Sequence, residues 1–118
     1  MKPAGVHQVA ICVDDVDAAL KFYVGVLGCE QRSDRPDFGF PGAWLDAGTQ
    51  QIHLMQFGAP APSFSHFALR VDDTEACCAD LEAAGVEFRR SDYVAGAGRQ
   101  VFLKDPAGNE IELNQPDR

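Results

Sequence analysis

The chain has 118 residues, a length that suits one domain with a modest core. Its formal net charge of −8 argues against nucleic acid or an anionic membrane surface as a partner, because phosphate groups would repel it. No segment approaches the roughly 20 apolar residues of a membrane span, and the N-terminus lacks the apolar run of a signal peptide. We therefore expect a cytoplasmic protein with reduced cysteines at Cys12, Cys29, Cys77 and Cys78, none in a CxxC pair.

The first half of the chain predicts a strand, a helix and three further strands. Residues 6–13 are apolar and β-branched, which indicates a strand. Asp15 or Asp17 can cap the helix that follows, and Gly28 ends it. The other strands are expected at 29–33, 43–45 and 51–57, with a loop at 34–42 and a turn at 46–50. The apolar content of that loop is typical of loops that border binding sites.

The same order repeats after a short linker. Residues 58–63 contain two prolines and show no periodicity. The second set of elements is a strand at 65–71, a helix at 74–84 ended by Gly85, and strands at 86–90, 100–104 and 110–114. The order predicts one α+β domain, 1–118, built from two tandem βαβββ modules, 1–58 and 63–118.

The duplication is visible in the residues themselves. Residues 46–56 align without a gap on residues 105–115, 59 positions later, and His53 falls on Glu112. Residues 7–15 align 58 positions later, and Gln8 falls on His66. The identical pairs are Ala10 with Ala68, Val13 with Val71, Asp14 with Asp72, Asp15 with Asp73, Asp46 with Asp105, Ile52 with Ile111, Leu54 with Leu113 and Gln56 with Gln115. Two copies predict a pseudo-symmetric domain.

Strand alternation places four possible metal ligands on one face. If the apolar residues of the aligned strands face the helices, the opposite face carries Gln8, His53, His66 and Glu112. A pseudo-twofold axis between the modules could bring these four around one point. Imidazole, carboxylate and amide donors suit a divalent metal such as Zn, Ni, Co, Mn or Fe. His7 would replace Gln8 only if a bulge or register shift reversed the alternation.

Each of these residues also has a plain structural interpretation. A single histidine in a strand is more often a hydrogen-bonded structural residue than a ligand, and a polar row is often the wet face of a sheet. The repeat favours the metal site. Arg70 lies on the strand face of His66 and could pair with a substrate carboxylate or phosphate, or form a surface salt bridge. The weaker pocket candidates are Arg99, Trp44, Phe38 and Phe40, for which a structural or exposed role is the alternative.

Several motifs together resemble those of the vicinal oxygen chelate superfamily. They are the element order, the sequence FYVGVLG at the end of the first helix, the closing DPAGNEIEL and the duplication. The superfamily includes glyoxalase I, methylmalonyl-CoA epimerase, fosfomycin-resistance transferases, extradiol dioxygenases and bleomycin-resistance proteins. The resemblance implies a curved mixed sheet around a cavity, with helices on its outer face. It also implies that each module lends two ligands to one metal, which here are Gln8 and His53 with His66 and Glu112.

The ligand set is similar to that of some glyoxalase I enzymes, which usually carry Glu where this chain has His53. The resemblance implies a metal-dependent lyase or isomerase that binds two adjacent oxygens of a small substrate and stabilises an enediolate-type intermediate. Glu112, the only carboxylate of the set, would be the base. The alternatives are an extradiol-type dioxygenase, which would have His in place of Gln8, and a non-catalytic antibiotic- or metabolite-binding protein. A homodimer is expected, with the site formed within one chain or across two.

Overall fold

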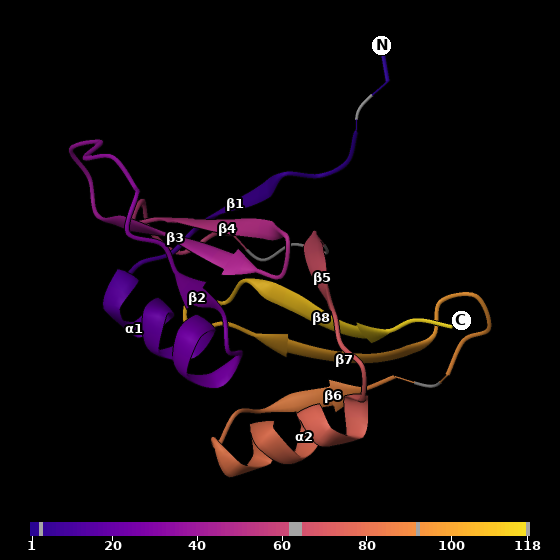
Figure 1. Cartoon of the computed structure of the whole chain (residues 1–118). Coiled ribbons are helices and arrows are strands. Elements are labelled where there is room, and N and C mark those ends of the chain that lie inside the picture. The colour runs from indigo at the N-terminus through magenta and orange to yellow at the C-terminus, as the bar shows by residue number, and fades with distance from the viewer. Residues whose placement is uncertain (3, 62–64, 92, 118) are drawn as a thin grey trace. The chain divides into compact units, whose positions relative to one another are not determined.

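The computed structural model describes residues 1–2, 4–61, 65–91 and 93–117. It contains two compact units, an N-terminal unit, Met1–Pro60, and a C-terminal unit, Ala61–Arg118 (Figure 1). Each unit holds one four-stranded mixed sheet and one helical segment in the order βαβββ, which confirms the α+β class and the two modules. Residues 62 and 63 of the expected linker lie outside the described residues. The single cavity expected between the modules stays a prediction.

The N-terminal sheet pairs its first strand with its last. The strands are β1 (Gln8–Cys12), β2 (Glu30–Gln31), β3 (Gly42–Ala47) and β4 (Gln50–Met55), in the order β1-β4-β3-β2. β1 runs parallel to β4, and the other two pairs are antiparallel. β3 and β4 extend further into the predicted turn than expected. Only Gly48 and Thr49 connect them, and the positive φ of Gly48, +62°, permits so tight a turn.

The N-terminal helix begins as predicted and ends in a different form. α1 (Val16–Leu20) is capped by Asp15, whose carboxylate accepts a hydrogen bond from the Ala18 N–H at 3.1 Å. The segment continues as a π-helix, η1 (Lys21–Val26), and Gly28 ends it with φ +79°. The buried residues of this unit are Val13, Val16, Ala19, Phe22, Tyr23, Cys29, Ala43, Leu45, Ile52 and Leu54, together with His53.

The C-terminal unit repeats this architecture. Its strands are β5 (His66–Arg70), β6 (Phe88–Arg90), β7 (Arg99–Lys104) and β8 (Glu110–Gln115), in the order β5-β8-β7-β6. α2 (Thr74–Ala83) packs against β7 and β8, and the Asp73 carboxylate caps it by accepting from the backbone N–H groups of Glu75 and Ala76. The apolar core of this unit consists of Cys78, Leu81, Val101, Leu103, Ile111 and Leu113.

A buried carboxylate shapes the turn that leads into β8. Asp105 accepts hydrogen bonds from the backbone N–H of Ala107 at 3.0 Å and of Asn109 at 2.8 Å. Its second oxygen accepts from the Asn109 side chain at 2.8 Å. Because β8 starts directly after this turn, these bonds fix the point from which Glu112 is positioned.

Helix length and the state of the cysteines complete the description of the fold. No helix within the described residues is both long and apolar enough to cross a membrane. The four cysteines form no disulfide with one another.

Candidate metal and ligand site

In the N-terminal unit, the structure brings Gln8 and His53 into contact. The parallel pairing sets Gln8 beside Gln51 and Ala10 beside His53, so these side chains lie on one face of the sheet. Gln8 Nε2 lies 3.0 Å from His53 Nδ1. The other ring nitrogen of His53, Nε2, lies 2.8 Å from Gln51 Oε1. The imidazole is therefore held at both nitrogens.

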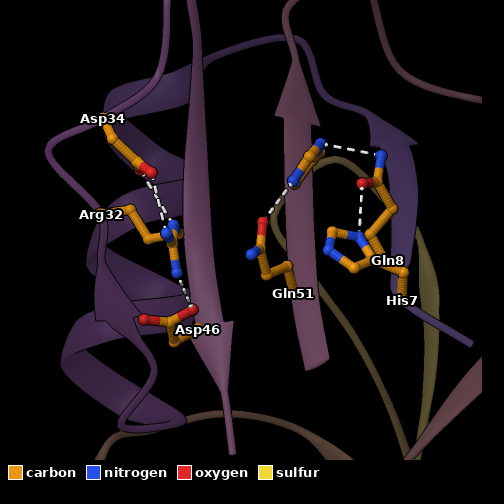
Figure 2. Close-up of polar contacts among 7 residues, drawn as sticks. His7, Gln8, Arg32, Asp34, Asp46 and Gln51 are labelled. Atoms are coloured by element: carbon orange, nitrogen blue, oxygen red, sulfur yellow. Dashed lines mark hydrogen bonds and ion pairs between the residues drawn. The ribbon is translucent and has the colours of Figure 1, made fainter. Parts of the chain in front are cut away.

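His7 lies beside this pair rather than on the opposite face of the sheet. Its Nδ1 is 2.9 Å from Gln8 Oε1 (Figure 2), and its carbonyl oxygen accepts from the Gln51 N–H at 3.1 Å. The expectation that alternation turns His7 away is wrong. β1 begins at Gln8, so the residue before it is not bound by the alternation of the strand. Gln8 is nevertheless the residue that contacts His53.

In the C-terminal unit, His66 and Glu112 form the equivalent contact. Their strands are parallel, Ala68 lies beside Glu112, and His66 Nε2 is 3.2 Å from Glu112 Oε1. The second oxygen, Oε2, accepts from Asn114 Nδ2 at 2.8 Å. Glu112 is buried and the His66 side chain is partly exposed. Both carboxylate oxygens are thus oriented by neighbouring side chains.

These two contacts have the separation expected of neighbouring ligands on one metal. Two donor atoms that each lie about 2.1 Å from a metal are about 3.0 Å apart in octahedral coordination and about 3.4 Å apart in tetrahedral coordination. The 3.0 Å and 3.2 Å separations fall in that range. Gln8 would need its amide rotated to present Oε1, and the amide oxygen and nitrogen are nearly equal in size. The donor types and spacing of both pairs therefore fit a divalent metal.

Each unit supplies only half of the proposed ligand set. Within the described residues, neither unit by itself groups three His, Cys, Asp or Glu side chains that could hold a metal. A four-ligand centre would need the Gln8–His53 pair together with the His66–Glu112 pair.

The surroundings of His53 favour the neutral imidazole that metals bind. Burial lowers the pKa of His53 below its ordinary value, and the charges of His7, Arg32 and Arg35 lower it further while Asp34 opposes them. Trp44 lies beside His53 in the antiparallel register of β3 and β4. The two rings are stacked, with centroids 4.4 Å apart and an interplanar angle of 12°.

A hollow of about 540 Å³ adjoins His53 in the N-terminal unit. Its walls come from the start of β1, from β3 and β4, and from the loop between β2 and β3. The lining residues are His7, Gln8, Ala10, Arg32, Asp34, Arg35, Phe38, Phe40, Trp44, Gln51, His53, Leu54 and Met55. The loop was expected to border a site, and Phe38, Phe40 and Trp44 were pocket candidates. Arg32, in the predicted strand 29–33, and Arg35 were missed, and the apolar content of the 34–42 loop was a signal for Arg35 alone.

Arg32 is neutralised by two carboxylates beside the hollow. It donates to both oxygens of Asp34 at 2.9 Å and 2.8 Å and to Asp46 at 2.9 Å (Figure 2). These hydrogen bonds raise the pKa of Arg32, and the bond from Arg32 lowers the pKa of Asp34. Arg32 therefore braces β2 and its loop against β3.

The two arginines that were predicted to bind substrate, Arg70 and Arg99, lie in the C-terminal unit. Arg70 is exposed and shares the alternating exposed positions of β5 with His66. Arg99 is exposed and lies over the Tyr93 ring, 5.9 Å from its centroid. Neither lines the hollow, and substrate binding by either stays a prediction.

Sequence reasoning missed Phe102, which meets His66 edge-on at 5.9 Å and carries Arg89 over its ring at 4.7 Å.

Two βαβββ modules with equivalent polar pairs on their first and last strands define a duplicated α+β protein. The chain belongs to the Glyoxalase/Bleomycin resistance protein/Dioxygenase superfamily, whose profile matches residues 5–113. A relative named probable lactoylglutathione lyase, from Vibrio parahaemolyticus, is 30% identical over 116 residues, which cover 87% of this chain and 84% of the relative.

Solved structures share the fold along nearly the whole chain. A putative glyoxalase family protein from Bacillus anthracis has a TM-score of 0.88 at 22% identity, covering 99% of this chain and 98% of its own. TnmS3, an antibiotic binding protein from Streptomyces sp. CB03234, has a TM-score of 0.78 at 29% identity and 99% coverage of each chain. The fold is therefore shared by a glyoxalase family protein and an antibiotic binding protein.

Proposed function

We propose that the protein is a metal-dependent, glyoxalase-like lyase or isomerase acting on a small substrate with two adjacent oxygen atoms. One observation carries this proposal. The equivalent positions of the two modules form equivalent contacts, Gln8 with His53 at 3.0 Å and His66 with Glu112 at 3.2 Å. The 30% identical relative named as a lactoylglutathione lyase supports the same class of reaction.

The four side chains would hold one divalent ion, Zn, Ni, Co, Mn or Fe. Such an ion supplies Lewis acidity, which draws electron density from the substrate oxygens. Gln8, His53 and His66 are neutral donors and Glu112 carries the only charge. The site would therefore keep a net positive charge with a divalent ion, which favours a substrate that develops negative charge on oxygen.

Glu112 is the proposed base. Its Oε1 faces His66 and its Oε2 is held by Asn114 at 2.8 Å, so the carboxylate has a fixed starting orientation. A carboxylate that takes a proton from one substrate carbon and returns it to the adjacent carbon completes an isomerisation without any co-reactant. Trp44 would contact the substrate in the hollow, and Arg70 and Arg99 are proposed to bind its anionic groups.

Metal content and turnover test this function together. Reconstituted protein should hold one equivalent of metal per ligand set, measured by elemental analysis, and should isomerise the hemithioacetal of methylglyoxal and glutathione. Glu112→Gln should lower kcat by on the order of 10²- to 10⁴-fold, and His66→Ala should lose the metal. Glu82→Gln, the same change at an exposed position of α2, is the matched control and should change neither. Protein without stoichiometric metal after reconstitution would refute the proposal.

A second candidate function is sequestration of an antibiotic or metabolite. The likeness to TnmS3, at 29% identity along 99% of the chain, favours it. Binding without turnover, indifferent to EDTA, is the expected outcome of a thermal-shift screen if this function holds. A shift that EDTA abolishes supports the metal-dependent enzyme instead.

We also infer a homodimer. Light scattering at micromolar concentration should give twice the chain mass, and a monomer mass would contradict this inference. Mixing His53→Ala protein with Glu112→Gln protein then tells how the site is completed. If each site takes ligands from two chains, a mixed dimer contains one intact site and activity returns. If one chain supplies all four ligands, every site carries one substitution and activity does not return.

A further inference from the structure

We propose that Arg35 recognises an anionic group of the ligand, and that the hollow selects flat, unsaturated carboxylates. This inference rests on the proposed function only in taking the same hollow as the ligand site, and it names a class of ligand that the hollow would bind.

Arg35 is held in place by the loop that carries it. Its Nη2 donates to the Phe40 carbonyl oxygen at 3.0 Å, and its guanidinium carbon lies 5.2 Å from the ring centroids of both Phe38 and Phe40. The guanidinium also occupies space beside Gly42. A Cβ atom at position 42 would lie 2.7 Å from Nη2 and 3.0 Å from Cζ. A cation fixed in this way loses little conformational entropy when a ligand binds.

The charge of Arg35 is available to a ligand, in contrast to that of Arg32. Arg32 makes three hydrogen bonds to the carboxylates of Asp34 and Asp46. Among the described residues no ion pair involves Arg35, and its guanidinium donates to a neutral group, the Phe40 carbonyl. Guanidinium has five N–H donors, so a planar carboxylate can still be met by two of them. Arg35 is thus a lining cation of the hollow with donors to spare.

A row of aromatic rings beside Arg35 favours a flat partner. Phe57 and Phe40 have centroids 4.5 Å apart, Phe40 and Phe38 5.9 Å, and Phe38 and Trp44 6.1 Å. The row ends on the stacked pair of Trp44 and His53. Phe38, which lines the hollow, is 51% exposed, so part of its ring surface is free to stack on a ligand. The rings would bind the unsaturated body of the ligand while Arg35 binds its charge.

Calorimetry with two matched ligands tests this inference. Cinnamate and cinnamamide have the same flat shape, differ in charge and are poor chelators, so both can be titrated into metal-free protein in EDTA. Cinnamate should bind roughly tenfold or more tightly than the amide, as a charge-assisted hydrogen bond implies. Arg35→Gln should lower the cinnamate affinity to that of cinnamamide and leave cinnamamide binding unchanged. Arg90→Gln, the same charge change in the C-terminal unit, should leave both affinities unchanged.

A second variant separates the roles of charge and rings. Phe38→Ala should weaken both ligands and preserve the ratio of their affinities. Equal binding of the two ligands by the unaltered protein overturns the inference, as does an Arg35→Gln protein that keeps the ratio. Arg35→Lys, which keeps the charge without the planar fork, should retain only part of the preference and serves if Arg35→Gln does not fold. Because no metal or turnover is involved, this inference and the proposed function can fail separately.

Discussion

Gln56 and Gln115 make the same hydrogen bond in the two modules. Oε1 of Gln56 accepts from the Val16 N–H at 3.0 Å, and Oε1 of Gln115 accepts from the Thr74 N–H at 2.9 Å. Each glutamine stands three residues after a proposed ligand, His53 or Glu112. Each therefore ties the end of the strand that carries a proposed ligand to the first turn of the helix in its own module, where unpaired backbone N–H groups need acceptors.

Gln56→Ala and Gln115→Ala should each lower the free energy of unfolding by about 1 kcal/mol, the usual effect of losing an acceptor at a helix start. Gln115→Ala should be the more destabilising, because Gln115 also accepts from Thr74 Oγ1 at 3.2 Å. Urea denaturation measures both. Gln31→Ala, at an exposed position of β2, is the control and should change stability by less than about 0.5 kcal/mol. Equal values for all three variants would contradict the shared role.

Protonation of His53 on acidification should be measurable through the fluorescence of Trp44, the only tryptophan of the chain. We expect protonation of the stacked imidazole to quench Trp44. Emission of the metal-free protein should then fall with a midpoint below pH 6.5, the ordinary pKa of histidine, because burial lowers the pKa of His53. His53→Gln should abolish the transition. His7→Gln should move the midpoint upward, because the charge of His7 lowers the pKa of His53. An unchanged curve in His53→Gln would assign the transition to another group.

The same titration should affect stability with a definite sign. The pKa of His53 is lower in the folded protein than its ordinary value of 6.5, so between these two values the unfolded chain binds more protons. The free energy of unfolding should therefore fall as pH decreases through this window and level off above it. His53→Gln should flatten that part of the curve in urea denaturation at a series of pH values.

Gly42→Ala should destabilise the N-terminal unit by about 1 to 3 kcal/mol or more. A Cβ there would clash with the Leu54 carbonyl oxygen across the β3–β4 pair and displace the Arg35 guanidinium. Gly25→Ala is the matched control, because nothing lies within 4 Å of its Cβ position and it is helical. This control should be neutral or more stable by up to about 1 kcal/mol in thermal or urea unfolding. A Gly42→Ala protein as stable as the parent would show that the sheet relaxes around the methyl group.

Asp105→Ala should be far more destabilising than Asp46→Ala, although the two residues align in the repeat. Asp105 is buried and accepts three hydrogen bonds within its turn, so its loss should lower the unfolding free energy by on the order of 3 kcal/mol. Asp46 forms a partly exposed ion pair with Arg32, a contact generally contributing about 1 kcal/mol or less. Chemical denaturation of both variants measures their free energies of unfolding. Comparable losses in the two variants would refute the predicted difference.

The sequence predicted those parts of the fold that depend on neighbouring residues. The N-cap of the first helix, predicted at Asp15 or Asp17, is Asp15 and follows from local hydrogen bonding. Gly28 and Gly85 mark the helix ends because positive φ suits glycine. The strand faces followed from alternation. That alternation also predicted Gln8 with His53, and His66 with Glu112, on the faces where the structure brings each pair into contact.

The parts that the sequence did not predict depend on contacts between distant segments. Arg35 lines the hollow because its loop folds back over Phe38, Phe40 and Gly42, and no periodic pattern constrains a loop. The direction of the His7 side chain was mispredicted because His7 lies one residue outside β1. The aligned Asp46 and Asp105 differ because β3 continues past Asp46, while β7 ends before Asp105. Sequence identity in a repeat thus specifies backbone direction better than side-chain partners.

The π-helix of the N-terminal module accommodates one residue more than the helix of the C-terminal module. From the capping Asp15 to Gly28 the chain has one residue more than from the equivalent Asp73 to Gly85. Within η1 the Leu27 N–H bonds to the Phe22 carbonyl five residues back, and this wider turn holds the surplus residue without unpairing the helix. Tyr23 remains fully buried and Gly28 still ends the helix. The two modules thus differ in length by one helical residue while the parallel pairing of their first and last strands is kept.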